Sequence, residues 1–294
     1  MNTTMSAESE TLKVPGASLY YEVRGSGPVL LMMPGGPADA GAFNAIVGEL
    51  DRAFTVLTYD PRGLSHSKLD EPLEDARIVQ TFADDVHRLL KAVTSEPAFV
   101  FGSSGGAVIG LELVARHPDQ VRTLVAHEPP AQALLPAHAR HPEQLDEIED
   151  TYRSAGVWPA MQKFMQSAGI KGGPPPAPQG EPTPEMVEGM AQMERNFSLF
   201  LGHYLKPVGL YQPDFAALKA SPVRIVPGVG QDSSGELAHE GGLGLATALG
   251  TDVVVFPGAH GGFDSHAVPF AVKLREVLAA KVSAAKVSAA KGRR

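Results

Sequence analysis

The 294-residue chain contains no cysteine. Disulfides, thiolate metal sites and a cysteine nucleophile are therefore excluded, and covalent chemistry has to use serine, threonine, aspartate, glutamate or lysine. No apolar run approaches the roughly 20 residues of a membrane-spanning helix, and the start, MNTTMSAESETLKV, lacks the basic and apolar segments of an export signal. A net charge of -8 argues against a general nucleic-acid-binding protein. We therefore expect a cytoplasmic protein whose partners are neither membranes nor nucleic acids.

Short strand-like runs alternate with helical patterns along most of the chain. The β-branched or aromatic runs bounded by glycine, proline or aspartate lie at 17–24, 28–33, 54–59, 98–102, 121–126, 223–227 and 252–256. Between them, apolar residues recur at helical spacing, for example over 78–94, 104–116 and 236–249. This alternation predicts the α/β class, with a mostly parallel, doubly wound sheet covered by helices on both faces.

The interval 131–217 interrupts this alternation, because it contains no convincing strand and is rich in proline, glutamine, glutamate and methionine. We interpret it as a helical cap (lid) inserted after the sixth strand. Its helices are expected near 142–155, 158–168, 184–205 and 213–219, with an exposed proline-rich loop at 169–184. A disordered linker is the alternative, but methionine and phenylalanine residues at helical spacing need a surface to pack on.

This interpretation also divides the chain into domains. The α/β core comprises 1–130 and 218–280, and the cap comprises 131–217. The remaining segment, 281–294, is a basic tail in which KVSAA occurs twice. Lysines recur there every five residues, which does not keep them on one helical face. We expect a frayed extension of the last helix, with a partner-binding arm as the alternative.

A Gly-x-Ser-x-Gly pattern stands where an apolar strand meets an alanine- and valine-rich helix. In FGSSGGAVIG the pattern begins at Gly102 and has Ser104 at its centre. This nucleophile elbow is a strained turn from strand to helix, which exposes the serine oxygen and tolerates only small neighbours. Ser104 is therefore the candidate nucleophile. Ser103 fits less well, because Phe101 would then occupy the first glycine position.

A glycine-rich loop, PGGPADAGAF, follows the strand at 28–33. Acyl transfer needs backbone N–H groups aimed at the developing oxyanion, and glycine lets the main chain approach the substrate. Gly36 is the natural donor of this loop, because Pro37 has no N–H. Gly105, directly after the elbow serine, is the expected second donor. A plain turn is the alternative for the loop.

One downstream histidine lies where the base of a serine nucleophile is expected. His260 follows the last strand in PGAHGG, at the carboxyl edge of the sheet, whereas His266 fits a surface or capping role. Two acids fit the chain order Ser, acid, His: Glu128 in AHEPP and Asp232 in GQDSSG. Pro129 favours an extended Glu128 backbone, which suits a carboxylate that orients a histidine. Both acids also have structural interpretations, as a strand-end cap and as a turn residue.

Together, the elbow, the PGGP loop, AHEPP and PGAH resemble the α/β-hydrolase superfamily over about residues 12–278. DPRG resembles the turn after the family's fourth strand, in which Asp60 and Arg62 would be structural. GSSGG followed by HEPP and PGAH is similar to the lactone-hydrolase group typified by zearalenone lactonase, whose triad acid is a glutamate in a His-Glu-x-Pro turn. This resemblance favours Glu128 over Asp232 as the triad acid.

The resemblance implies a serine hydrolase that cleaves a carboxylic ester or lactone through an acyl-enzyme, with no metal or organic cofactor. It does not extend to the substrate contacts of the cap, so the expectation of an apolar small-molecule substrate comes from the cap residues themselves. Aromatic and methionine side chains of the cap would form an apolar ceiling over the site. They are Trp158, Met161, Phe164, Phe197 and Tyr204. The alternatives are a proline-iminopeptidase-like or other acyl-transfer enzyme of the same fold, and a small-molecule sensor with slow turnover. Whether the protein forms a homodimer stays open.

Overall fold

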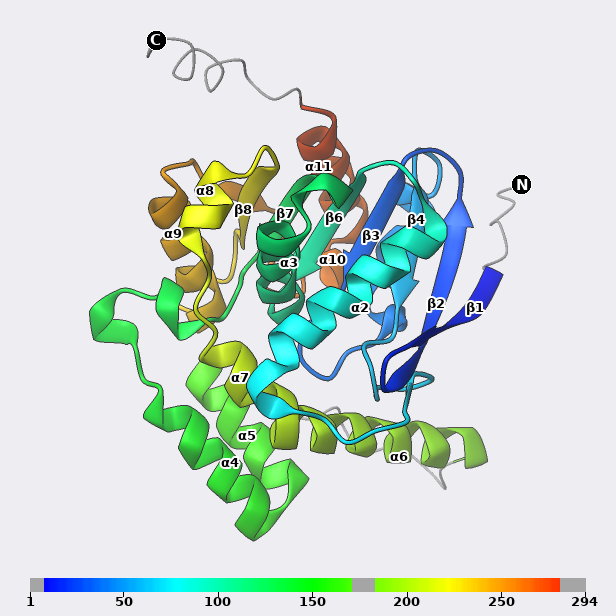
Figure 1. Ribbon diagram of the computed structural model, residues 1–294. Helices are drawn as coiled ribbons and strands as arrows, with labels where there is room; N and C mark the ends of the chain where they lie inside the picture. Colours follow the sequence, from blue (N-terminus) through cyan, green and yellow to red (C-terminus); the bar gives the residue numbers. More distant parts are fainter. Residues whose placement is uncertain (1–7, 171–182, 281–294) are drawn as a thin grey trace.

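A nine-stranded sheet forms the centre of the computed structural model, which describes residues 8–170 and 183–280 (Figure 1). The strands are β1 (Glu8–Val14), β2 (Ala17–Gly25), β3 (Val29–Met33), β4 (Thr55–Tyr59), β5 (Lys68–Leu69), β6 (Ala98–Ser103), β7 (Val121–His127), β8 (Arg224–Gly230) and β9 (Val254–Phe256). Their order is β1-β2-β4-β3-β6-β7-β8-β9, with β5 paired to β2. The pairings of β2 with β1, β4 and β5 are antiparallel, whereas β4, β3, β6, β7, β8 and β9 run parallel to one another. The carboxyl ends of the parallel strands therefore meet at one edge.

Helices cover both faces of the sheet. On one face lie α1 (Asn44–Leu50) and α11 (Ala267–Ala279), and on the other lie α2 (Ile78–Val93), α3 (Gly105–Arg116) and α9 (Leu237–Leu249). In Figure 1, α2 and α3 stand in front of the sheet and α11 behind it. The short α10 (Gly262–Ser265) precedes α11. Each face thus has its own apolar core.

The central strand β3 shows how one run of residues builds both cores. Its sequence, VLLMM, is apolar throughout, as expected for a parallel strand buried on two faces. Leu30 and Met32 pack in the cluster under α1 and α11, whereas Leu31 and Met33 pack in the cluster under α2 and α3. Successive side chains of a strand point to opposite faces, which explains the alternation.

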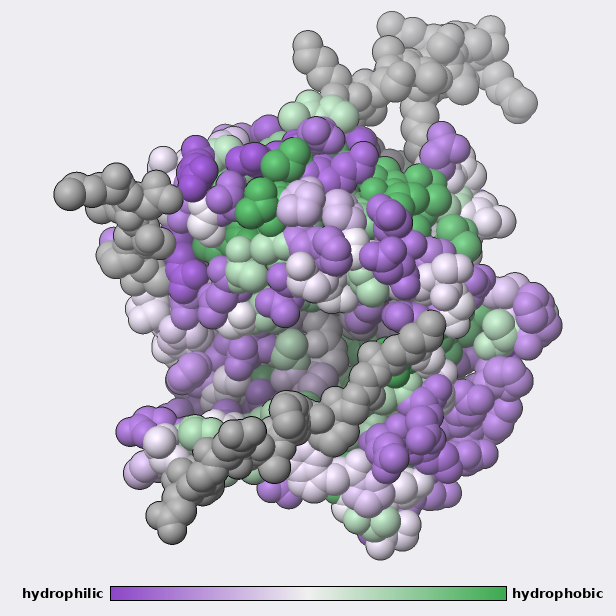
Figure 2. Space-filling model, turned by 180° about the vertical axis from the view of Figure 1, so that it is seen from behind, coloured by the Kyte–Doolittle hydropathy of each residue, from purple (hydrophilic) through white to green (hydrophobic). Residues whose placement is uncertain are grey.

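Between β7 and β8 the chain forms the helices of the cap. These are α4 (Glu143–Ala155), α5 (Val157–Ala168), α6 (Pro184–Leu199), a π-helical turn (Phe200–Tyr204) and α7 (Leu205–Gly209). They lie together at the carboxyl edge of the sheet, below the core in Figure 1. From behind, the lower part of the molecule, where the cap lies, is largely hydrophilic on its outside (Figure 2). The short α8 (Phe215–Ala220) returns to the core beside α3 and α9.

The α/β fold predicted from the sequence is confirmed, and β7 is the sixth strand when the two-residue β5 is left out. The helix expected over 184–205 begins at Pro184 but changes to a π-helical turn at Phe200. Most of the proline-rich loop and the KVSAA tail fall outside the described residues. None of the described helices combines the length and the apolar character that a membrane crossing requires.

Candidate active site

Ser104 lies in a strained turn between β6 and α3. Its backbone angles are φ 56° and ψ -123°, a region that residues other than glycine rarely adopt. The Ser104 N–H donates to the carbonyl of His127 at 2.9 Å, and the Ser104 carbonyl accepts from the N–H of Ala107. The turn is thus held by β7 on one side and by the first turn of α3 on the other. This is the geometry expected of a nucleophile elbow.

The glycines around Ser104 are required by close backbone approaches. A methyl group on Gly102 would lie 2.6 Å from the Gly106 carbonyl oxygen, and one on Gly106 would lie 2.3 Å from the Met33 carbonyl oxygen. A methyl group on Gly35 would lie 2.5 Å from the Ser104 β-carbon. All three distances are well inside van der Waals contact, so the elbow and the loop after β3 can meet only without side chains.

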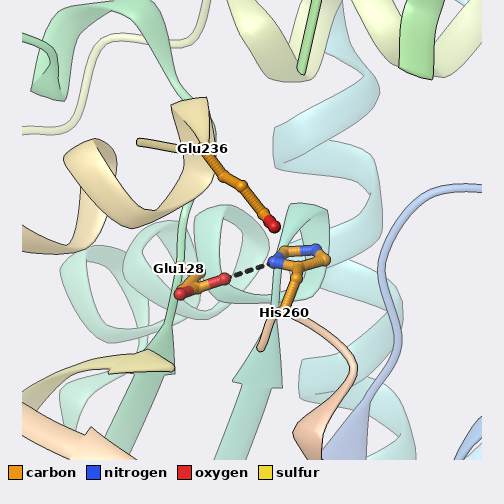
Figure 3. A group of neighbouring side chains, drawn as sticks. All are labelled: Glu128, Glu236 and His260. Carbon is orange, nitrogen blue, oxygen red and sulfur yellow. Dashed lines mark hydrogen bonds and ion pairs between the residues drawn. The ribbon is translucent and has the colours of Figure 1, made fainter. Parts of the chain in front are cut away.

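Glu128 and His260 are joined by a direct contact. The Oε2 atom of Glu128 lies 2.5 Å from Nδ1 of His260, a distance typical of a charge-assisted hydrogen bond (Figure 3). The Glu128 side chain is fully buried, whereas His260 is 26% exposed and reaches the pocket that Ser104 also lines. The structure therefore brings together the serine, the histidine and the glutamate predicted from the sequence.

The second oxygen of Glu128 is held by the start of the next loop. Oε1 accepts a hydrogen bond from the Gly230 N–H at 2.8 Å and another from the Ser233 hydroxyl. Burial on its own would raise the pKa of the Glu128 carboxyl, but the hydrogen bond from His260, the charge of the neighbouring histidines and the Ser233 hydroxyl outweigh it and lower that pKa to about 2. Glu128 is consequently ionised at neutral pH.

The backbone of Glu128 differs from the expectation. We predicted an extended conformation because Pro129 follows, but the φ angle of Glu128 is 51°, in the left-handed region. Its N–H donates to the Gly228 carbonyl at 3.0 Å, which continues the pairing of β7 with β8 for one more residue, and its carboxylate is fixed on both oxygens. These tertiary bonds override the local preference that proline imposes.

The other candidate acid and the second histidine lie at the surface. Asp232 is exposed, and in the described parts of the chain no hydrogen bond or ion pair joins it to His260. Its neighbour Ser233 instead turns inward to Glu128. His266 is exposed at the start of α11 and makes no capping hydrogen bond through its side chain.

Gly36 and Gly105 lie next to one another in the wall of the pocket that Ser104 also lines. A methyl group on Gly105 would lie 3.6 Å from the Gly36 nitrogen, and both residues line the pocket with Ser104 and His260. Gly36 has a φ angle of 57°, which glycine adopts without strain. Across residues 8–170 and 183–280, neither N–H donates to a protein acceptor. Both donors are therefore available to an oxygen atom in the pocket.

The pocket itself is mostly apolar. Its apolar side chains come from the core and the cap and include Phe82, Ile109, Leu145, Ile148, Phe164, Ile170, Phe200, Leu205, Val208 and Leu237. Of the five cap residues proposed as a ceiling, Phe164 and Tyr204 line the pocket. Trp158, Met161 and Phe197 do not line it. Trp158 is 43% exposed and packs edge-on against Phe197, and Met161 is buried in the core cluster.

A second carboxylate near His260 was not predicted. Glu236, which precedes α9, lines the pocket, and Figure 3 shows its side chain pointing at His260 from a different element than Glu128. One atom of each of these three residues lies within 4.8 Å of the others. Carboxylate and imidazole atoms at this spacing can hold a cation, although Glu128 and His260 already bond to each other. No motif surrounds Glu236, so the sequence offered no signal for it.

The DPRG segment has the structural role expected of it. Asp60 accepts hydrogen bonds from the Ala40 N–H at 2.9 Å and the His66 N–H at 2.8 Å. Arg62 forms a buried, two-pronged ion pair with Asp85, at 2.6 and 2.7 Å. These contacts fix the turn after β4 beside the loop that carries Gly36.

Comparison with known proteins points in one direction. Residues 28–155 match the family model described as alpha/beta hydrolase fold. The chain is 36% identical to an uncharacterized hydrolase, YraK, of Bacillus subtilis, over 93% of this chain and 97% of the relative. It is 26% identical to a zearalenone hydrolase of Bionectria ochroleuca, over 89% of this chain and 94% of that protein. Among solved structures, the esterase RhEst1 from a Rhodococcus species superposes with a TM-score of 0.70 at 17% identity, covering 94% and 99% of the two chains.

Proposed function

This chain belongs to the α/β-hydrolase family and is a hydrolase, and we propose from that premise that it cleaves a carboxylic ester or lactone through an acyl-enzyme on Ser104. The observation that carries the proposal is the 2.5 Å contact between buried Glu128 and His260, in the pocket that Ser104 lines. A serine becomes nucleophilic only beside a base whose orientation and charge are controlled. Gly36 and Gly105 supply the two N–H groups that such a reaction needs.

In the proposed reaction, the Ser104 hydroxyl attacks the carbonyl carbon of the substrate while His260 takes the hydroxyl proton through Nε2. Glu128, ionised at neutral pH, fixes the tautomer of His260 through Nδ1 and stabilises the imidazolium that forms. The oxyanion accepts hydrogen bonds from Gly36 and Gly105. His260 then protonates the leaving alcohol, and a water molecule activated by the same imidazole releases the acid. No step needs a metal or organic cofactor.

The substrate proposed is an apolar small molecule. The predominantly aliphatic and aromatic lining of the pocket favours an uncharged acyl or alcohol part, since burying a charge there would be costly. The zearalenone hydrolase relative makes a lactone one of the substrates to test. A rise in kcat/KM of p-nitrophenyl esters from acetate to octanoate would support an apolar acyl site, and a flat series would contradict it.

The acyl-enzyme itself can be tested by labelling. An alkyl fluorophosphonate should add one phosphonyl group to the wild-type chain, on the peptide that contains Ser104, and none to Ser104→Ala. Intact-mass spectrometry followed by peptide mapping measures both. Labelling at another residue, or undiminished labelling of Ser104→Ala, would contradict the proposal.

One observation favours a second candidate, an enzyme whose acyl substrate carries an amine. The Glu236 carboxylate lines the pocket close to His260, and a carboxylate is a natural partner for an ammonium group. Prolyl and aminoacyl p-nitroanilides distinguish the two candidates. Turnover of these amides above that of the esters would favour the iminopeptidase-like alternative. Tight binding of esters without product would favour a sensor.

A further inference from the structure

One face of the cap helix α6, continued by the π-helical turn, packs on two loops of the core. They are the loop after β3, which carries Gly36, and the turn after β4, which carries Arg62 and Ser65. Asn196, Phe200 and Tyr204 follow each other at four-residue spacing on this face. Asn196 contacts both loops, and the Phe200 ring lies 4.0 Å from where a methyl group on Gly36 would be. The Tyr204 hydroxyl donates to the Arg62 carbonyl. The cap therefore contacts the Gly36 loop directly.

Asn196 is the polar centre of this contact and is 6% exposed. Its Nδ2 donates to the Pro37 carbonyl at 3.2 Å and to the Ser65 hydroxyl at 2.9 Å. Its Oδ1 accepts from the Ser65 N–H at 3.0 Å and from the Gln192 side chain at 2.9 Å. An asparagine amide has two donors and two acceptor lone pairs, so its capacity is fully used. Such a buried and satisfied polar group specifies one arrangement of the segments it joins.

The bonds of Asn196 continue toward the start of η1 (Ala40–Phe43), the 3-10 helix that follows the Gly36 loop. Ser65, whose φ angle of 47° is strained for a serine, donates through its hydroxyl to Asp39 at 2.5 Å. Asp39 in turn accepts from the Gly41 N–H at 2.9 Å. Two contacts therefore fix the loop that carries Gly36 and Pro37. Asn196 holds the Pro37 carbonyl, and the hydrogen bonds from Ser65 to Asp39 and from Gly41 to Asp39 hold the residues that follow.

We propose that Asn196 is a positioning residue for the oxyanion hole: it holds the Pro37–Ala38 peptide, which follows Gly36 in the same loop, so that the N–H of Gly36 points correctly only while α6 is seated on the core. The inference rests on the proposed function of Gly36 as an oxyanion donor. It adds a coupling between the cap and the chemical step, because displacement of α6 breaks the bond to Pro37 and releases the loop. Loss of an oxyanion donor costs about 100- to 1000-fold in kcat, and loosening one costs part of that.

The test compares Asn196→Ala with wild type and with Gln192→Ala, which removes one bond to Asn196 but none to the loops. We expect Asn196→Ala to lower kcat for p-nitrophenyl butyrate about 10- to 100-fold with KM within threefold. The affinity of a trifluoromethyl ketone, which forms an oxyanion on the serine, should fall by the same factor. Gln192→Ala should change each quantity less than threefold.

Two results would overturn the inference. The first is a lower melting temperature of Asn196→Ala with unchanged kcat and unchanged ketone affinity, which would show that Asn196 only stabilises the fold. The second is a change in KM alone, which would show that Asn196 acts on substrate binding by the cap and not on the oxyanion hole. Asn196→Ser, which keeps a small polar group, replaces Asn196→Ala if the latter does not fold.

Hydrogen exchange of the peptide covering 34–43 gives a readout without turnover. Exchange there should be faster in Asn196→Ala than in Gln192→Ala, and equal exchange would also contradict the inference. If wild type hydrolyses no ester, the proposed function fails, while the exchange result still decides whether Asn196 holds the loop.

Discussion

His127 should make the folded protein sensitive to acid. Its imidazole is fully buried, and neither ring nitrogen has a hydrogen-bond partner among the described residues. The rings of Phe101, Phe256 and Phe270 surround it at centroid distances of 5.9, 5.5 and 5.6 Å. Burial in this apolar cage lowers the pKa of His127 from 6.5 to about 4. The side chain is therefore neutral in the folded protein.

The sign of the effect follows from proton binding. Between pH 6.5 and pH 4 the unfolded chain binds a proton at His127 that the folded chain does not bind, so the free energy of unfolding falls as the pH falls. With pKa values of 6.5 and about 4, this site alone removes about 2.5 kcal/mol between pH 7.5 and pH 4.5. Glu128 adds little to this change. Its lowered pKa stabilises the folded state above about pH 4.5, and this stabilisation is lost only as the pH falls from there toward 2.

His127→Leu removes this titration. We expect wild type to lose about 2.5 kcal/mol more than His127→Leu when urea unfolding, followed by far-UV circular dichroism, is compared at pH 7.5 and pH 4.5. His266→Leu is the control, because His266 is exposed and should behave as wild type. The comparison of the two pH values cancels the packing change that leucine introduces. Equal acid-induced losses in wild type and His127→Leu, within about 0.5 kcal/mol, would refute the reasoning.

Three further predictions concern packing, charge and the pocket. Gly106→Ala should abolish activity and lower stability by several kcal/mol, because its methyl group would lie 2.3 Å from the Met33 carbonyl oxygen. The control is Gly48→Ala, whose methyl group on α1 meets open space and should leave stability unchanged or raise it. Equal melting temperatures of the two variants would contradict this. Arg62→Met leaves Asp85 buried without its partner and should cost about 3–5 kcal/mol in urea unfolding; a loss below about 1 kcal/mol would show that the pair is dispensable. Glu236→Gln should tighten inhibition by the carboxylate product up to about tenfold, since it removes a like charge beside His260, while inhibition by the alcohol product should not change; unchanged acid inhibition would place the product away from Glu236.

Much of the fold was predictable because the apolar residues of most strands and helices recur at the spacing typical of those elements. β1 was missed, since ESETLKV is polar and mostly exposed and becomes a strand only by antiparallel pairing with β2. The π-helical turn at Phe200–Tyr204 was also missed. Apolar spacing shows that a segment is a helix, but it does not show a local change of hydrogen-bond register that tertiary contacts impose.

The candidate site also contains residues that the sequence predicted and residues that it did not. Ser104, Gly36, Gly105, Glu128 and His260 stand in short motifs whose residue types are set by local geometry, so the sequence identified them as candidates. Asn196 and Glu236 carry no such signal, because their importance comes from contacts with residues far away in the chain. The spacing of cap residues likewise could not tell which apolar side chains face the pocket and which, such as Trp158, pack against another helix.

The measurement that tests the central claim most directly is the turnover of p-nitrophenyl esters and an aromatic macrolactone by wild type, Ser104→Ala, Glu128→Gln and Asp232→Asn, with folding checked by circular dichroism. The account predicts that Ser104→Ala loses at least about 1000-fold in kcat, that Glu128→Gln loses about 100- to 10,000-fold, and that Asp232→Asn stays within about threefold. Full activity of folded Ser104→Ala, or a large loss in Asp232→Asn with Glu128→Gln nearly unaffected, would contradict it.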